Sequence, residues 1–436
     1  MKEWIGETFT SDLGWDHLER LVNIGNRMAG SEGEREAAEA TRDALIEAGA
    51  RNARLEPFEL QGWTRGHSAI EADSTIQESI ALPRSPNGEV TAELVDVGYG
   101  LPDDFEEADL EGKIAMARSD VPDWYDRYLH RREKYFHAVE AGAAAFVYRN
   151  HVEGCLPPTG SVTGSDGPIG EIPAVGVSKE VGSRLARRFD GETMTVTVEC
   201  DVHDATSQNV HAELGPDTEN EVYLTSHVDA HDIAEGAMDN GAGTAMSVEV
   251  VRALAQREEE LDTKVHVIAY GAEEVGLVGA ERHAETTDFD TVKAILNDDG
   301  VVGGRTLRLV SHGFAELRDA AETVADRFDH PISVVPELGP HSDHWEYVKW
   351  GVPGFHAVSE TEGSGRGWGH TYADTLDKLE PRTFREQAIL LTEVVVELAD
   401  DDRSIDHRDP DEIATQLEDE DLAESMKITG DWPYDT

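Results

Sequence analysis

The feature that most constrains the fold is a repeated order of buried strand, short loop and helix between residues 207 and 400. Apolar runs typical of strands occur at 222–225, 264–270, 293–296, 307–310 and 352–357, and helical patterns at 241–257, 275–284, 317–328 and 382–399. This alternation predicts an α/β fold with a mixed, mostly parallel sheet sandwiched by helices. In such sheets, functional groups gather beyond the carboxyl ends of the strands.

The rest of the chain divides into segments of different composition. Residues 11–50 are predicted to be helical, with a capping box at Ser31 and Glu34 and an end near Gly49, and a strand is expected around 53–60. Residues 75–200 carry short strand-like pieces and many Gly and Pro residues, which indicates a compact inserted domain. We therefore predict one discontinuous domain over 1–74 and 201–400, an insert over 75–200, and an acidic, only partly ordered tail over 401–436.

Charge is the strongest signal of the composition. The 436 residues include 90 acidic and 37 basic side chains, a formal net charge of −53 spread along the whole chain. Such a surface repels itself in dilute buffer and is screened by salt, so we interpret it as halophilic rather than as cation-storing or polycation-binding. Nucleic acids and anionic membranes are unsuitable partners for it. The sequence does not indicate an oligomeric state.

Cysteine count and N-terminal sequence bear on the compartment. The only cysteines are Cys155 and Cys200, which excludes a disulfide framework and a cysteine-rich zinc site but leaves one bridge open. The first residues lack the apolar segment and cleavage site of a signal peptide, and no apolar run approaches the roughly 18 residues of a membrane span. We therefore expect a cytoplasmic protein in a high-salt cytosol.

Potential metal ligands follow one predicted strand after another. They lie in the segments Ser226-His227-Val228-Asp229, Met238-Asp239-Asn240, Gly271-Ala272-Glu273-Glu274, Asn297-Asp298-Asp299-Gly300 and His370-Thr371-Tyr372-Ala373-Asp374. Two imidazoles with several carboxylates form a ligand set that suits Zn²⁺ and also Co²⁺ or Mn²⁺. Each segment alone has a non-functional explanation, such as a solvated Glu pair or a turn at 298–300. The prediction of a metal site depends on finding all of the segments together, in order, mostly at strand ends.

The ligand set favours two metal ions over one. Asp239, at a helix start, is placed to bridge two cations, and two ions about 3.5–4 Å apart can share one water. The adjacent side chains of Glu273 and Glu274 diverge, so one can bind metal while the other acts as general base. Asp229 is expected to orient His227 through a hydrogen bond.

These segments resemble the co-catalytic zinc aminopeptidases of metallopeptidase family 28, which include aminopeptidase Y, bacterial leucyl aminopeptidases and carboxypeptidase Q-like enzymes. The resemblance covers about 15–60 and 205–400, and extends to Ser342-Asp343-His344-Trp345 and Gly351-Val352-Pro353-Gly354. It implies the zinc exopeptidase type of sheet, also called phosphorylase/hydrolase-like. The insert resembles a protease-associated domain, a small β-rich lid, through its Gly-Lys-Ile-Ala and Ala-Gly-Ala-Ala-Ala-Phe-Val runs.

The resemblance implies two Zn²⁺ ions and a role for each ligand. His227 and Asp299 would hold the first ion, Glu274 and His370 the second, Asp239 would bridge them, and Glu273 would be the general base. Asp299 is favoured over Asp298 because of its spacing to Gly300. The implied activity is the removal of N-terminal residues from peptides by a metal-activated water.

One position departs from the family pattern, and three other functions are to be distinguished from an aminopeptidase. Many relatives carry a Tyr before the last His, where Gly369 stands here, so Tyr372, Trp368 or the metals alone would have to stabilise the oxyanion. A carboxypeptidase or dipeptidase would use the same metals and a basic side chain such as Arg366. A glutaminyl cyclase-like acyltransferase would bind one zinc, and a non-catalytic binding protein would have lost ligands. The sequence leaves the preferred side chain and the native metal open.

Overall fold

The computed structural model describes residues 3–125, 127–164, 169–361 and 367–434 and divides the chain into two compact units. The first unit comprises residues 1–60, 205–363 and 374–416, and the second comprises 61–204, 364–373 and 417–436. Two long strands, β1 (Arg51–Ala72) and β8 (Thr193–Leu214), pair with each other and pass from one unit into the other. No helix of the described residues has both the length and the apolar character that a membrane crossing requires.

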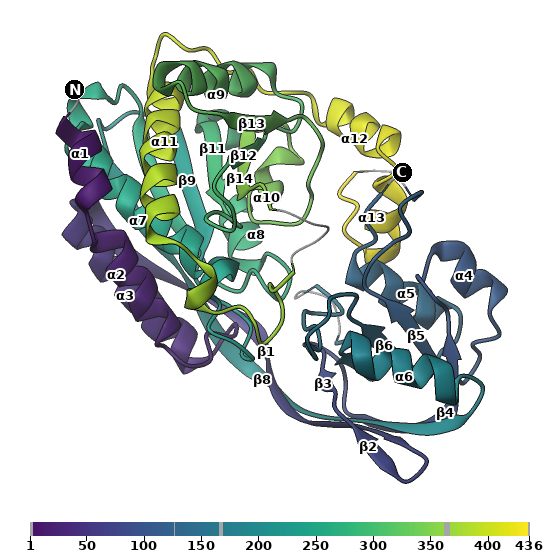
Figure 1. Ribbon diagram of the computed structural model, residues 1–436. Helices are drawn as coiled ribbons and strands as arrows, with labels where there is room; N and C mark the ends of the chain where they lie inside the picture. The colour runs from purple at the N-terminus through teal and green to yellow at the C-terminus, as the bar shows by residue number, and fades with distance from the viewer. Residues whose placement is uncertain (1–2, 126, 165–168, 362–366, 435–436) are drawn as a thin grey trace. The chain divides into compact units, whose positions relative to one another are not determined.

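The first unit is built around a twisted sheet in the order β13-β12-β14-β11-β9-β10-β8 (Figure 1). Its further strands are β9 (Glu221–His227), β10 (Lys264–Tyr270), β11 (Val292–Asp298), β12 (Leu307–Val310), β13 (Ile332–Val335) and β14 (Gly354–Ser359). Its helices are α1 (Glu3–Thr10), α2 (Leu13–Val22), α3 (Glu32–Ala48), α7 (Ala242–Ala255), α8 (Val278–Ala284), α9 (Ala315–Phe328), α10 (Trp345–Val348), α11 (Pro381–Ala399) and α12 (Pro410–Asp419). Short turns of helix occupy Ala237–Gly241, Glu258–Glu260, Phe289–Thr291 and Leu376–Lys378.

The central strands of this sheet are parallel. Strand β9 runs parallel to β10 on one side and to β11 on the other, and β11 runs parallel to β14. The register pairs His227 with Tyr270, the last residues of β9 and β10, and Thr225 with Asn297 near the end of β11. The loops that leave these three strands therefore begin at the same edge of the sheet. The predicted mixed, mostly parallel α/β sheet is confirmed.

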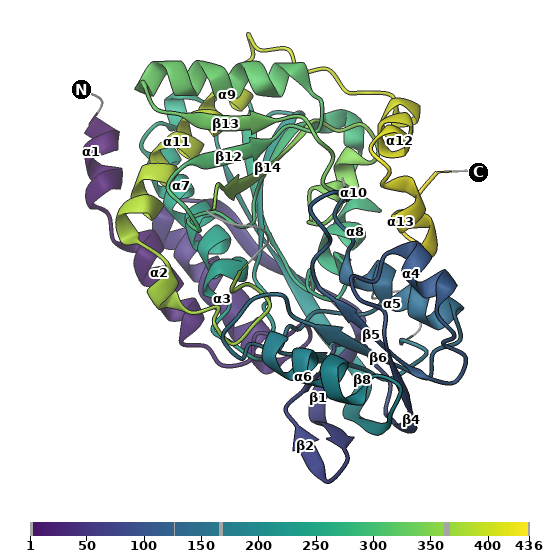
Figure 2. The ribbon, with the colours of Figure 1, turned by 45° about the vertical axis from the view of Figure 1, so that its right-hand side comes forward.

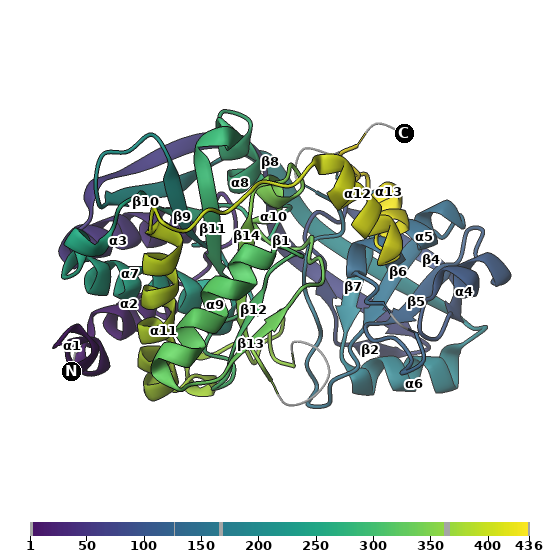
Figure 3. The same cartoon turned by 90° about the horizontal axis from the view of Figure 1, so that it is seen from above.

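Helices cover both faces of the sheet. On one face α7 packs on β9 and β11, and α2, α3 and α11 pack on α7 (Figure 3). On the other face, Ala280 of α8 and Tyr347 of α10 pack against Tyr223 and Ile268 of the sheet. Helix α9 lies along β13 at the end of the sheet (Figure 2). The sheet is thus buried between two helical layers.

The predicted helix at 31–50 is confirmed with its end signals. Ser31 precedes α3 and its Oγ accepts a hydrogen bond from the Glu34 backbone N–H at 3.1 Å. Gly49 ends the helix with φ at +106°, a conformation that glycine adopts without steric cost. The Glu34 side chain is fully buried, and its Oε2 atom accepts the backbone N–H of Gly30, just before the helix, at 2.7 Å.

The second unit has its own core. Its strands are β2 (Thr75–Gln77), β3 (Ile80–Ala81), β4 (Gly88–Asp96), β5 (Ile114–Arg118), β6 (Ala145–Arg149) and β7 (Ala174–Val177), and its helices are α4 (Pro102–Glu107), α5 (Arg131–Glu140), α6 (Lys179–Phe189) and α13 (Ala423–Thr429). Strands β4 to β7 are parallel neighbours. Alternation along β5 sends Ile114 and Met116 toward α6, and Ala115 and Ala117 toward α5. The predicted β-rich insert is confirmed, and helices α5 and α6 cover the two faces of its sheet.

The C-terminal tail differs from our expectation of partial order, because it contains α12 and α13. Ile413 and Leu417 are fully buried, and their spacing of four residues puts them on one helical face beneath the acidic residues. The tail is also divided between the units at residue 416, and the second unit begins at residue 61. The boundaries predicted from the sequence lie at residues 401 and 75.

Gly243 provides a test of this packing. A Cβ added there would lie 2.0 Å from the backbone O of Asp298 and 2.3 Å from Asn240 Oδ1. We expect Gly243→Ala to lower the free energy of unfolding by about 1–3 kcal/mol, because β11 or α7 must move. Denaturant unfolding in molar salt measures this. Gly6→Ala in α1 is the control, since nothing lies within 4 Å of the added Cβ. Equal stability of the two variants would contradict the packing described.

Candidate metal centre

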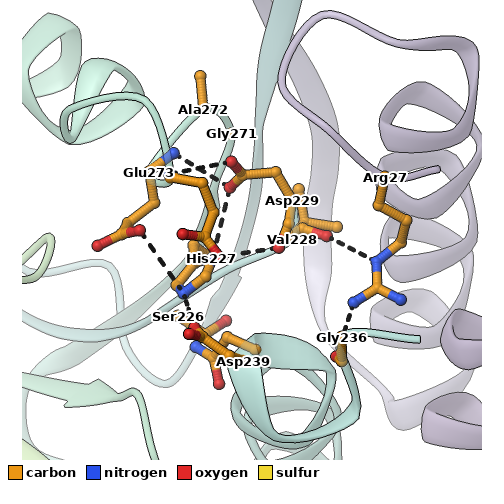
Figure 4. A network of polar contacts seen from close by, with 12 residues as sticks. Arg27, Ser226, His227, Val228, Asp229, Gly236, Asp239, Gly271, Ala272 and Glu273 are labelled. Atoms are coloured by element: carbon orange, nitrogen blue, oxygen red, sulfur yellow. Dashed lines mark hydrogen bonds and ion pairs between the residues drawn. The ribbon is translucent and has the colours of Figure 1, made fainter. Parts of the chain in front are cut away.

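The parallel register brings acidic loops together at the ends of three strands. His227 is the last residue of β9, Glu273 follows β10 by three residues, and Asp299 follows directly on β11. Asp239 lies in the turn Ala237–Gly241 that precedes α7. Figure 4 shows Asp239 and Glu273 on opposite sides of the His227 imidazole.

The Nε2 atom of His227 faces three carboxylates. It lies 3.3 Å from Asp239 Oδ1, 3.6 Å from Asp299 Oδ1 and 4.0 Å from Glu273 Oε2. One ligand atom from each of His227, Glu273 and Asp299 lies within 4.8 Å of the other two. His227 is fully buried, so these charges meet with little screening by water.

The pKa values reflect this crowding. Burial acts to lower the pKa of His227, yet the carboxylates led by Glu273 raise it well above its ordinary value. Burial raises the pKa of Glu273 well above its ordinary value, and Glu274 and Asp299 add to the rise, which His227 opposes. The cluster therefore has a strong affinity for positive charge.

The donor set fits a metal ion. Within the described parts of the chain, His227 Nε2 makes no hydrogen bond, although acidic groups surround it. Arg27 is a buried cation nearby, but it donates hydrogen bonds to the backbone oxygens of Leu21, Val228, Glu235 and Gly236. An imidazole nitrogen with several carboxylate oxygens matches the N/O ligands that Zn²⁺ takes. A divalent cation would remove the repulsion among these carboxylates.

Asp229 orients two parts of this cluster, as Figure 4 shows. His227 Nδ1 donates to the Asp229 backbone O at 3.2 Å and lies 3.4 Å from Asp229 Oδ1, which leaves Nε2 directed at the carboxylates. The Asp229 Oδ1 and Oδ2 atoms also accept the backbone N–H groups of Glu273 and Glu274, each at 3.1 Å. The same carboxylate thus fixes the imidazole and the Glu-Glu pair.

The loop between His227 and Asp239 is held from two sides. Arg27 donates to Val228 and Gly236, two contacts drawn in Figure 4. Asp374 accepts the backbone N–H groups of Met238 at 2.7 Å and of Asp239 at 3.2 Å. The sequence gives no sign of these roles of Asp374 and Arg27, because the contacts join residues far apart in the chain.

Asp298 and Asp299 have different surroundings. Asp299 Oδ2 accepts a hydrogen bond from Ser342 Oγ at 2.7 Å, while its Oδ1 faces His227. The Asp298 side chain is fully buried beside Ser247 Oγ at 3.5 Å, and burial raises its pKa well above the ordinary value. The structure places Asp299, not Asp298, in the cluster.

Glu274 lies beside a residue that our reading of the sequence missed. Its Oε2 atom is 2.9 Å from Nε2 of His231, which is 5% exposed. The signal for it was the position of His231 four residues after His227 in the same loop. His370 belongs to the segment 364–373 of the second unit, where its Nδ1 lies 3.4 Å from the Thr159 backbone O. Arg366, the basic candidate for a substrate carboxylate, lies outside the described residues.

The chain is similar in sequence and in structure to several known proteins. Residues 209–395 match the sequence model of peptidase family M28, and residues 90–185 match that of the PA domain. Aminopeptidase YwaD of Bacillus subtilis (strain 168) is 27% identical over 398 residues, covering 86% of this chain and 81% of its own. Carboxypeptidase Q of Bos taurus is 26% identical over 418 residues, covering 88% and 85%. The structure of an aminopeptidase from Aneurinibacillus sp. strain AM-1 superposes with a TM-score of 0.70 and 26% identity, covering 94% of this chain and 99% of that one.

The adjacent pair Asp298 and Asp299 offers a test of metal binding. We expect Asp299→Asn to bind roughly one zinc ion fewer per chain, because a neutral amide replaces a charged oxygen in the cluster. Asp298→Asn should keep the wild-type metal content, since its carboxyl lies outside the cluster with a raised pKa. Elemental analysis of both proteins, purified in molar salt with zinc, measures the difference. Equal zinc content in the two variants would exclude Asp299 as a ligand.

Proposed function

We propose that the chain is a metallo-exopeptidase of family M28, and more closely a zinc aminopeptidase that removes N-terminal residues from peptides. One observation carries this proposal: a buried imidazole nitrogen, His227 Nε2, is faced by the carboxylates of Asp239, Glu273 and Asp299 at the carboxyl edge of a parallel sheet. The family match covers the residues that form this cluster.

Five side chains would hold the metals. His227 and Asp299 would bind the first ion, Glu274 and His370 the second, and Asp239 would bridge them. When bound, zinc lowers the pKa of a water to about 7 and polarises the carbonyl to be attacked. Cobalt or manganese would be accepted by the same oxygen-rich donor set. His231 would donate a hydrogen bond to Glu274 and fix the orientation of its carboxylate.

Glu273 would be the general base. Its carboxylate lies beside the proposed metal ligands, 4.0 Å from His227 Nε2, where it would take a proton from the attacking water and return it to the leaving amine. Its backbone N–H is fixed by Asp229, so the carboxylate enters the reaction from a set position. Asp229 would act by orienting Glu273 and His227, without contacting the substrate.

The similarity to aminopeptidase YwaD supports a substrate with a free amino group. Arg27, the buried guanidinium near the cluster, donates to backbone oxygens. The alternative is a carboxypeptidase or dipeptidase with the same metals, which the similarity to carboxypeptidase Q supports. A glutaminyl cyclase-like acyltransferase would bind a single zinc ion, and a metal count separates it.

The role of Glu273 is tested by its amide. We expect Glu273→Gln to lower kcat by about 10²–10⁴-fold, because an amide cannot accept the proton of the water. Zinc content should stay at the wild-type level, since Glu273 is not among the proposed ligands. Glu285→Gln, an exposed position after α8, is the control and should keep full activity. Hydrolysis by Glu273→Gln at the wild-type rate would show that Glu273 is not the general base.

Peptides with a blocked N-terminus or C-terminus test from which end the enzyme removes residues. We expect hydrolysis of a short peptide with a free N-terminus and an amidated C-terminus, and at least about 100-fold slower hydrolysis of the N-acetylated peptide, because acetylation removes the ammonium charge. Mass spectrometry of the products shows which residue leaves. If the acetylated peptide is still cleaved and the C-terminally amidated peptide is not, the protein is a carboxypeptidase and the aminopeptidase proposal is wrong.

A further inference from the structure

A second buried carboxylate supports the loop that carries Glu273. The Oε1 atom of Glu34, in the first turn of α3, accepts hydrogen bonds from Ser207 Oγ at 2.6 Å and from the Ala272 backbone N–H at 3.0 Å. Its Oε2 atom accepts the Gly30 backbone N–H at 2.7 Å. Glu34 therefore joins α3, β8 and the loop after β10 at one buried point.

Glu34 and Asp229 together hold three consecutive backbone N–H groups. The N–H of Ala272 points to Glu34, and those of Glu273 and Glu274 point to the two oxygens of Asp229. Carboxyl oxygens are good acceptors for backbone amides. The backbone on both sides of the proposed base is therefore fixed by hydrogen bonds to two buried carboxyl groups.

The backbone at Ala272 needs such support. Its φ is +58°, in the left-handed region that a residue with a Cβ enters at a cost of roughly 1–2 kcal/mol. The preceding residue is Gly271, where an added Cβ would lie 2.3 Å from Ser207 Oγ and 2.9 Å from Glu34 Oε1. The chain thus makes a tight, costly turn against Glu34 immediately before Glu273.

Helix capping does not account for this position of Glu34. Burial, and then the neighbouring Asp229, raise the pKa of Glu34 to about 8, so its charged form is costly here. An exposed carboxylate at the end of α3 would cap the helix without that cost. The inward position is explained by the contacts that it makes with Ser207 and Ala272.

We propose that Glu34 is a positioning residue that holds the Gly271-Ala272 turn and thereby aims the carboxylate of Glu273. The proposal rests on the proposed function, because it takes Glu273 as the base. Glu34 lies beneath the loop and acts through the Ala272 amide, without contacting the substrate or a metal. A small displacement of a reacting group lowers the rate steeply, about 10²-fold for 1 Å, so a loosened turn should be visible in kcat.

The test compares two buried glutamates. Glu249, 1% exposed on α7, likewise accepts a serine hydroxyl (Ser11, 2.8 Å) and a backbone N–H (Gly14, 3.0 Å). We expect Glu34→Gln to lower kcat by about 10–100-fold with KM and zinc content near wild type, because the single amide oxygen cannot accept from both the Ala272 and the Gly30 N–H groups. Glu249→Gln should lose thermal stability and keep kcat.

Two further measurements distinguish a displaced Glu273 carboxylate from a general loss of stability. Ala272→Gly removes the cost of the left-handed turn, so adding it to Glu34→Gln should restore part of the lost kcat, and adding it to Glu249→Gln should change nothing. Hydrogen exchange should speed up at residues 272–274 in Glu34→Gln and remain unchanged there in Glu249→Gln. If Glu34→Gln does not fold, Ser207→Ala removes one contact to the same carboxylate and should lower kcat by a few-fold.

The outcomes distinguish this proposal from the proposed function. Unchanged exchange at 272–274 together with unchanged kcat in Glu34→Gln would overturn the positioning role and leave the aminopeptidase intact. Equal loss of kcat in the Glu34 and Glu249 variants would overturn it as well. A wild-type protein that holds zinc but hydrolyses no peptide would reject the function instead, and the exchange comparison would still report on the turn.

Discussion

Repulsion among buried carboxylates is the constraint on which the rest of this structure depends. Asp239, Glu273 and Asp299 all lie within 4.0 Å of one imidazole nitrogen, in a region with little water. Two like charges 4 Å apart repel by about 4 kcal/mol at the effective dielectric constant of such a site. A fold tolerates this only with a compensating cation and with rigid loops that prevent the acids from separating.

The same type of hydrogen bond, from backbone N–H groups to a buried carboxylate, holds the loops at three places. A buried carboxylate outside the ligand cluster accepts backbone N–H groups from the segment that carries a functional side chain. Asp374 accepts those of Met238 and Asp239. Asp229 accepts those of Glu273 and Glu274, and Glu34 accepts that of Ala272. Excess negative charge beneath the site therefore fixes the loops, while the charge within it is what we propose binds metal.

The strand–helix alternation was readable from the sequence because buried parallel strands are continuous apolar runs. That pattern, with polar residues directly after each run, sufficed to name His227, Asp239, Glu273 and Asp299, which the parallel register brings together. Helices α6 and α12 were missed because charged residues outnumber the few apolar positions, such as Leu185 and Ile413, that are buried. The contacts of Arg27, Glu34 and Asp374 join segments that are distant in sequence, and no local pattern encodes them.

The two long strands β1 and β8 bear on the order of folding. The first unit cannot complete its sheet until residues 60 and 205 meet, and 144 residues, 61–204, separate them. Closing a disordered loop of that length costs chain entropy before any strand pairing is gained. If the second unit forms first around its own core, β1 and β8 are already paired and the long loop shrinks to a short one. The inserted unit then serves as an internal template for assembly of the peptidase sheet, whatever it does in the folded enzyme.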